Sequence, residues 1–196
     1  MRITFLALLI SLAFLSGCTS VKRVEPGETI DLSGEWNDTD SQQVAEEMIK
    51  DSVDRAWIAE YKGEFKRKPV VIVGHVKNNT GDHINTEPFT KELERAFINS
   101  GKLKVVAGVG ERPQLRQEVI QMSNNVRPET LKQIRRETGA DFMLMGVVND
   151  IVDKVGGKSV RFYQINLELI ALESHEKVWI GQKKIKKFVK KGMFVF

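Results

Sequence analysis

The sequence predicts an α/β domain with a mixed β-sheet, packed helices and a C-terminal three-stranded antiparallel meander. Two observations predict this class. In the first half of the chain, apolar residues at helical spacing alternate with short β-branched runs. In the second half, three long strand-like segments are separated only by turn residues. A helical half followed by hairpin-connected strands argues against a doubly wound parallel fold.

The N-terminus has the pattern of a bacterial secretion signal that ends in a lipobox. Arg2 precedes an apolar run over residues 3–15, and small residues lead into Cys18, the single cysteine of the chain. We therefore expect residues 1–17 to be a signal peptide and Cys18 to carry a lipid. The run is too short for a typical membrane-spanning helix. The residue directly after this cysteine is Thr19 and not aspartate, which favours anchoring at the periplasmic face of the outer membrane. An ordinary signal peptide with a chance cysteine, or an uncleaved anchor, is the alternative.

The remaining chain divides into a tether and one domain. Residues 18–38 hold scattered charges and no sustained periodicity, and a flexible coil of about 20 residues has a reach of about 25 Å. Trp36, near the end of this segment, is expected to pack on the domain edge. Residues 39–196 have a suitable length and composition for a single globular domain.

The helical half begins with a long helix. Thr39 and Gln42 fit a capping box, and apolar residues recur at helical spacing until the helix ends near Gly63. A buried β-branched strand over residues 70–76 follows. Gly74 inside this strand indicates close packing.

A second helix is expected from Thr86, with Gly101 as a left-handed C-cap. A strand over residues 102–106 follows, and then two short helices near 113–122 and 128–137.

The meander consists of three strands over residues 141–155, 159–172 and 178–189. Gly156-Gly157 is a two-residue hairpin signal, and residues 174–176 form the second turn. The middle strand alternates between one buried and one open face. Its apolar residues are Ile165, Leu167, Leu169 and Ala171, and its polar ones are Gln164, Asn166 and Glu168.

No residue pattern indicates catalysis, a cofactor or a metal site. His75, His83 and His175 have no metal-ligand spacing around them, and the single cysteine is the lipid site. The net charge is +4, but six of the 30 cationic residues lie in residues 183–191. The rest of the chain holds slightly more acids than bases, so we expect no nucleic-acid binding.

The lysine run over residues 183–190 has two interpretations. Lysine on an exposed edge strand hinders edge-to-edge aggregation. Alternatively, the lysines form a docking surface for an acidic partner, anionic lipid or the cell wall. Phe162 is a second candidate interface residue, because it lies among the polar residues of its strand.

Several segments together resemble the LpoB family of outer-membrane lipoproteins that activate bifunctional penicillin-binding proteins. The resemblance covers about residues 31–189. The segments that carry it are residues 32–41, 44–49, 68–74, 78–80, 93–102 and 139–141.

The resemblance implies a TolB N-terminal-like fold, which is shared with the curli secretion lipoproteins. It also implies a monomeric regulator, not an enzyme, that docks on an accessory domain of the synthase and stimulates peptidoglycan synthesis. For the docking face we select Phe162, Gln164 and Asn166 together with Lys184 and Lys186. The alternative is a curli-secretion-like or other structural outer-membrane lipoprotein without an activator role.

Overall fold

The protein forms a five-stranded mixed sheet. The computed structural model describes residues 22–25, 28–31, 33–108, 110–115, 117 and 139–190. The strands of the sheet, in spatial order, are β2 (Lys104–Val106), β1 (Val70–Asn79), β3 (Phe142–Val155), β4 (Lys158–Ala171) and β5 (Lys177–Lys190). β1 pairs in parallel with β2 and β3, whereas β3, β4 and β5 are antiparallel. The predicted mixed sheet with a C-terminal meander is confirmed.

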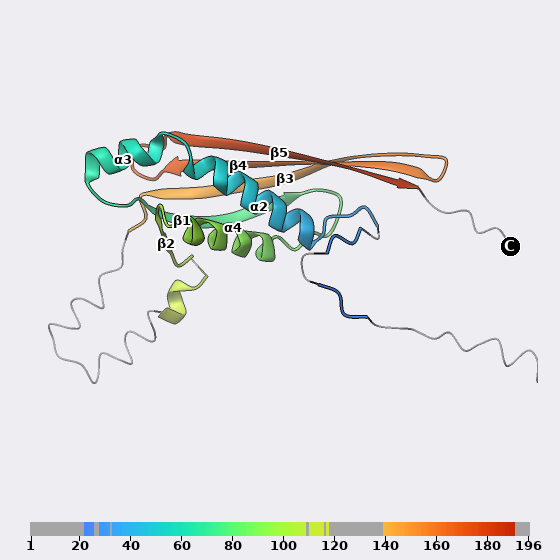
Figure 1. The fold of residues 1–196 in the computed structure, drawn as a ribbon, viewed down its shortest axis with the longest axis horizontal. Helices are drawn as coiled ribbons and strands as arrows, with labels where there is room; N and C mark the ends of the chain where they lie inside the picture. The colour runs from blue at the N-terminus through green and yellow to red at the C-terminus, as the bar shows by residue number, and fades with distance from the viewer. Residues whose placement is uncertain are drawn as a thin grey trace, which may run out of the picture.

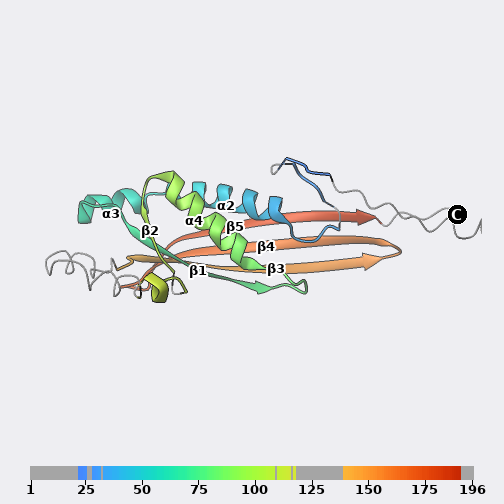
Figure 2. The same cartoon turned by 90° about the horizontal axis from the view of Figure 1, so that it is seen from below.

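Two long helices cover one face of this sheet. α2 (Asp38–Val53) lies over β5, and α4 (Thr86–Ser100) lies over β1 (Figures 1 and 2). Between these layers lies the core, because α2 and α4 bury their apolar stripes against alternate residues of the strands. Its largest fully buried side chains include Ile49, Phe89, Leu93, Phe97, Leu144, Tyr163, Ile165, Leu167 and Leu169.

The first helical segment differs from the sequence prediction in two ways. Its capping box is formed by Asn37 and Asp40, not by Thr39 and Gln42. The chain also breaks after Val53 and continues as α3 (Trp57–Phe65). At the break, the Ser52 carbonyl accepts from the Trp57 indole (2.8 Å) and from the Arg55 N–H (3.4 Å), so it is satisfied without a continuing helix.

The glycine predictions agree with the structure. A Cβ on Gly74 would lie 3.0 Å from the Leu144 carbonyl oxygen, beside an irregularity in the β1–β3 register. Gly101 has φ +64° and ends α4. The two helices expected near 113–122 and 128–137 lie largely outside the described residues, although residues 112–115 are helical.

The meander extends beyond the helices. β3, β4 and β5 are each 14 residues long, and their far ends project past α2 and α4 as a twisted ribbon (Figure 1). The residues that lead directly into α2 lie toward this same end of the molecule (Figure 1). Among the helices of the described residues, none is long and apolar enough to cross a membrane.

Candidate partner-docking face

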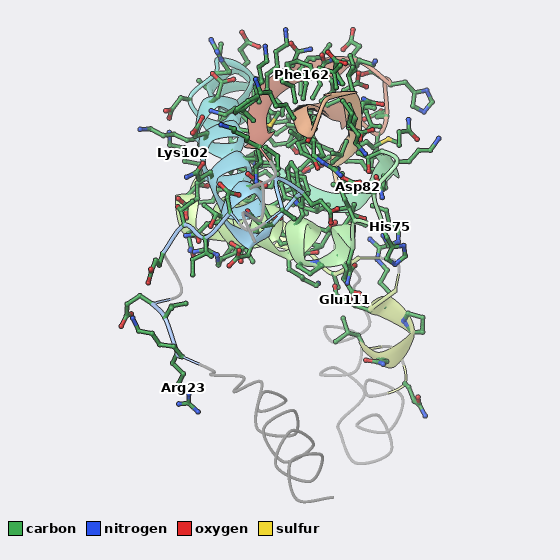
Figure 3. All side chains as sticks on the ribbon, turned by 90° about the vertical axis from the view of Figure 1, so that its right-hand side faces the viewer. Arg23, His75, Asp82, Lys102, Glu111 and Phe162 are labelled. Atoms are coloured by element: carbon green, nitrogen blue, oxygen red, sulfur yellow. The ribbon has the colours of Figure 1, made fainter. Side chains whose placement is uncertain are left out.

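The sheet face that points away from α2 and α4 brings the five selected residues together. Phe162 pairs with Lys186, and Gln164 pairs with Lys184, across β4 and β5. Asn166 follows two residues along β4 on the same face. The β4 side chains are half-buried and the two lysines are exposed. Figure 3 shows Phe162 on the side of the sheet opposite the helices.

We call this surface the open face and define it by three cross-strand rows of β3, β4 and β5. The rows are Ile151–Phe162–Lys186, Asn149–Gln164–Lys184 and Val147–Asn166–Gln182.

Amide side chains connect strands across the open face. The Gln182 Nε2 donates to Asn166 Oδ1 (3.0 Å), and Gln164 Nε2 approaches the same oxygen at 3.4 Å. Asn79 on β1 donates to Asn149 on β3 at 3.4 Å. Amides keep unused donor and acceptor positions at such sites. The face therefore offers hydrogen bonds beside one aromatic side chain and two cations.

The lysine run divides between the two sides of β5. Lys183 and Lys187 point toward α2, where Lys183 forms an ion pair with Glu47. Lys184 and Lys186 point outward and take part in none of the ion pairs between described residues. Because side chains alternate along a strand, one lysine-rich segment serves both packing and surface charge. β5 is also an edge of the sheet, as the aggregation-blocking interpretation requires.

Lys187 fastens the segment before α2 to the sheet. Its Nζ lies 2.7 Å from Asp31 Oδ1 and 2.6 Å from Asp40 Oδ2. Burial opposes the charge on Lys187, but the hydrogen bonds to these two carboxylates outweigh it and hold the pKa of Lys187 above its usual range. Trp36 lies in the same segment and packs edge-on against Phe89 with centroids 5.7 Å apart, which confirms its expected position.

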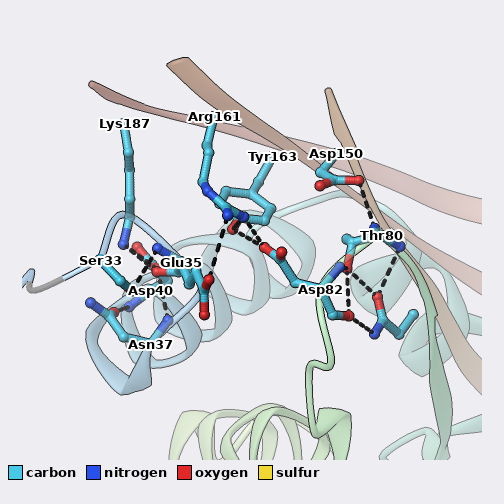
Figure 4. Close-up of polar contacts among 12 residues, drawn as sticks. Ser33, Glu35, Asn37, Asp40, Thr80, Asp82, Asp150, Arg161, Tyr163 and Lys187 are labelled. Atoms are coloured by element: carbon cyan, nitrogen blue, oxygen red, sulfur yellow. Dashed lines mark hydrogen bonds and ion pairs between the residues drawn. The ribbon is translucent and has the colours of Figure 1, made fainter. Parts of the chain in front are cut away.

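A second polar cluster, the Asp82 cluster, joins three parts of the chain (Figure 4). Arg161 forms an ion pair with Asp82 and approaches Glu35 at 3.4 Å. The Tyr163 hydroxyl donates to Asp82 Oδ2 at 2.8 Å. The cluster therefore ties the N-terminal segment and the β1–α4 loop to the helix-covered side of β4.

The electrostatics of this cluster favour its ionised form. Burial raises the pKa of Asp82, but the hydrogen bonds from Arg161 and Tyr163 outweigh this effect and hold the pKa below its usual range. Burial raises the pKa of Tyr163 to about 12, and its hydrogen bond to Asp82 adds to this rise. Tyr163 consequently stays protonated and remains a hydrogen-bond donor at physiological pH.

Sequence reasoning did not find the Asp82 cluster. The alternation recognised at Ile165 and Leu167 extends back to Tyr163 and Arg161, so their inward position could have been read from the period of two. Asp82 lies 79 residues before Arg161 and carries no local signal of this contact.

Within the described part of the chain, no three His, Cys, Asp or Glu residues form a group that could hold a metal ion. His75 lies exposed on β1, His83 in the following loop and His175 in the β4–β5 turn, so the fold does not bring them together. Cys18 lies outside the described residues, and its lipidation stays a prediction.

The fold and the open face describe an α/β domain with one helix-covered and one accessible sheet face. Residues 40–185 match the family described as peptidoglycan-synthase activator LpoB. The chain therefore belongs to the LpoB family, as the sequence resemblance indicated. A comparison with curated proteins found no match.

Several solved structures are similar to this chain. The LpoB C-terminal domain from Escherichia coli is 20% identical, with 67% of this chain and 93% of that chain covered and a TM-score of 0.39. The solution structure of E. coli LpoB is 16% identical, with coverages of 89% and 83% and a TM-score of 0.41. Lipoprotein GNA1162 from Neisseria meningitidis is 19% identical, with coverages of 61% and 83% and a TM-score of 0.39. The family assignment rests on the family match alone.

Proposed function

We propose that this protein is a lipid-anchored periplasmic regulator that binds and stimulates a bifunctional penicillin-binding protein. Membership of a family of peptidoglycan-synthase activators supports the class of target. The open face supports the mode of action, because it collects an aromatic side chain, amides and two outward lysines on a rigid sheet. Cys18 carries the lipid that holds the protein at the outer membrane.

The proposed mechanism is allosteric binding. To stimulate the synthase, the open face must bind the active conformation more tightly than the inactive one, because only differential affinity shifts an equilibrium. Phe162 is the proposed anchor at the centre of the contact, and Lys184 and Lys186 steer an acidic partner surface toward it. The accessory domain of the synthase is the proposed contact.

Glycan-strand synthesis by the organism's bifunctional penicillin-binding proteins, with and without residues 19–196, tests this proposal. These residues contain every described helix and strand of the domain. We expect one synthase to be stimulated at near-stoichiometric amounts. No stimulation of any synthase by folded protein would contradict the proposal.

A matched pair of variants tests the position of the contact. Phe162→Ala combined with Lys184→Gln and Lys186→Gln should abolish most of the stimulation. The control combines Lys50→Gln and Lys104→Gln, two exposed lysines on α2 and β2, and should stimulate normally. Equal loss in both variants would indicate a general charge effect instead of a docking face.

The lysine-rich edge strand β5 supports a monomer. Two copies that paired along β5 would bring their lysine-rich edges together, and such like-charge contacts oppose association. We therefore expect light scattering to give the mass of one chain, whereas a ring-sized mass would favour a structural export role.

A further inference from the structure

The ribbon end is unusual for its exposed apolar side chains. We define it as residues 151–160 of the β3–β4 hairpin together with residues 188–190 of β5. Three of its apolar residues are largely exposed: Ile151 (67%), Val155 (76%) and Phe188 (65%). The open-face rows run into this region, but its tip lies beyond the helices (Figure 1).

The same tip carries three lysines (Lys154, Lys158 and Lys190) and a single acid, Asp153. Lys158 and Lys190 face each other directly across β4 and β5, and Val155 completes their row on β3. Like charges in directly opposed positions are unfavourable. Neither lysine takes part in any ion pair between described residues, and nor does Lys154, which pairs with Ser159 and points to the other face of the hairpin. An anion from outside the chain would therefore relieve the repulsion between Lys158 and Lys190.

The length of the N-terminal segment allows this tip to reach the membrane that holds the expected lipid anchor. Asp31 forms an ion pair with Lys187. In the strand register, Lys187 on β5 lies opposite Arg161 on β4, which lies opposite Val152 on β3. The tip at Val155 lies three residues further along β3, which is about 10 Å. Asp31 lies thirteen positions after Cys18, a span of at most about 45 Å.

We propose that the ribbon end docks on an anionic phospholipid surface, the leaflet in which the Cys18 lipid is inserted. Val155, Phe188 and Ile151 enter the interfacial region, and the lysines bind lipid phosphates. Lysine suits this arrangement because its methylene stem packs along apolar groups while the ammonium stays at headgroup level. A bilayer suits this surface better than the glycan of the cell wall, because glycan has no hydrocarbon region to receive the apolar side chains.

This binding site goes beyond the proposed synthase regulation and rests on it only for the anchor at Cys18. Because rows of the open face continue into the ribbon end, the membrane and the synthase compete for Phe162 and Lys186. Docking on the membrane and binding to the synthase would therefore exclude each other.

Co-sedimentation of residues 19–196 with vesicles tests the proposal without a lipid anchor or a synthase. We expect binding to phosphatidylglycerol-containing vesicles and little binding to pure phosphatidylcholine, with a loss at high salt. Combined Lys154→Gln, Lys158→Gln and Lys190→Gln should weaken binding about tenfold or more. The control with Lys50→Gln, Lys62→Gln and Lys104→Gln removes equal charge on α2, α3 and β2 and should bind normally.

A fluorescent label tests the orientation. Residues 19–196 contain no cysteine, so Val155→Cys and Glu64→Cys each create one labelling site, at the ribbon end and on α3 at the far end. An environment-sensitive dye should shift to the blue on anionic vesicles only at position 155.

Three results would overturn the proposal: equal binding to neutral and anionic vesicles, equal loss in the control variant, or an unshifted dye at position 155. Sedimentation with isolated peptidoglycan but not with vesicles would assign the surface to the wall and overturn it as well. None of these results depends on whether the synthase is stimulated.

Discussion

Asp82 is a single residue on which three segments of the chain converge. Its carboxylate accepts from Tyr163 and pairs with Arg161, whose guanidinium also approaches Glu35. The Arg161 side chain is only 11% exposed, so the loss of its partner would leave a charge with little water around it. The contact therefore matters more for stability than an ion pair on the surface.

We expect Asp82→Asn to lower the free energy of unfolding by about 2 kcal/mol, because it removes the charge that compensates Arg161. Chemical denaturation checks this value. Asp153→Asn on the exposed part of β3 is the control and should change stability by less than about 0.5 kcal/mol.

The stability difference between the wild-type protein and Asp82→Asn should depend on pH. The pKa of Asp82 is lowered in the folded state, so its contribution is fully present above the unfolded value of 3.8 and is lost as pH falls through the folded value. The stability difference between the wild-type protein and Asp82→Asn should therefore shrink below pH 3.8. A difference that stays constant in acid would show that the charge on Asp82 does not stabilise the cluster.

At the scale of one element, β5 combines two functions in one lysine run. Its inward lysines hold α2 and the preceding segment against the sheet, and its outward lysines shape the open face and the ribbon end. The division follows from strand geometry alone, because neighbouring residues point to opposite faces. Adjacent lysines should therefore respond differently to the same substitution.

Lys187→Met and Lys186→Met form a matched test within β5. Lys187→Met leaves Asp40 unpaired in a buried position and should destabilise the domain by about 2 to 3 kcal/mol. Lys186→Met should leave stability within about 0.5 kcal/mol of the wild-type protein. Thermal or chemical unfolding separates the two outcomes. Equal destabilisation would contradict the division of the run.

At the scale of the whole molecule, the contacts of residues 31–37 shorten the expected tether. Asp31 and Glu35 are held by Lys187 and Arg161, which leaves residues 18–30 between the lipid site and the first fixed point. A flexible coil of this length has a typical reach of about 20 Å. If the proposed lipid anchor and synthase lie in opposite membranes, the short reach of this segment limits their contact.

We expect a 20-residue Gly/Ser insertion after Val24 to increase the reach of the domain to about 30 Å. In cells, crosslinking between this protein and the proposed synthase should then rise or stay equal, whereas deletion of residues 20–29 should reduce it. An unchanged crosslinking yield after the deletion would show that reach does not limit the contact.

The accuracy of the sequence predictions depended on how local each signal was. Gly101 and the Gly156-Gly157 turn were correctly predicted, because a positive φ is a local demand that glycine meets. The N-terminal capping box was assigned two residues too late, because Asn37 and Asp40 satisfy the same pattern as Thr39 and Gln42.

The sequence by itself determined the α/β class, the meander and the side of β4 on which each residue lies, because these follow from periodicity and turn chemistry. It also placed Phe162, Gln164 and Asn166 on one face. Only the tertiary structure decided that Lys184 and Lys186 complete that face and that Asp82 pairs with Arg161. Register and long-range pairing depend on how distant segments pack together, and no local pattern encodes that packing.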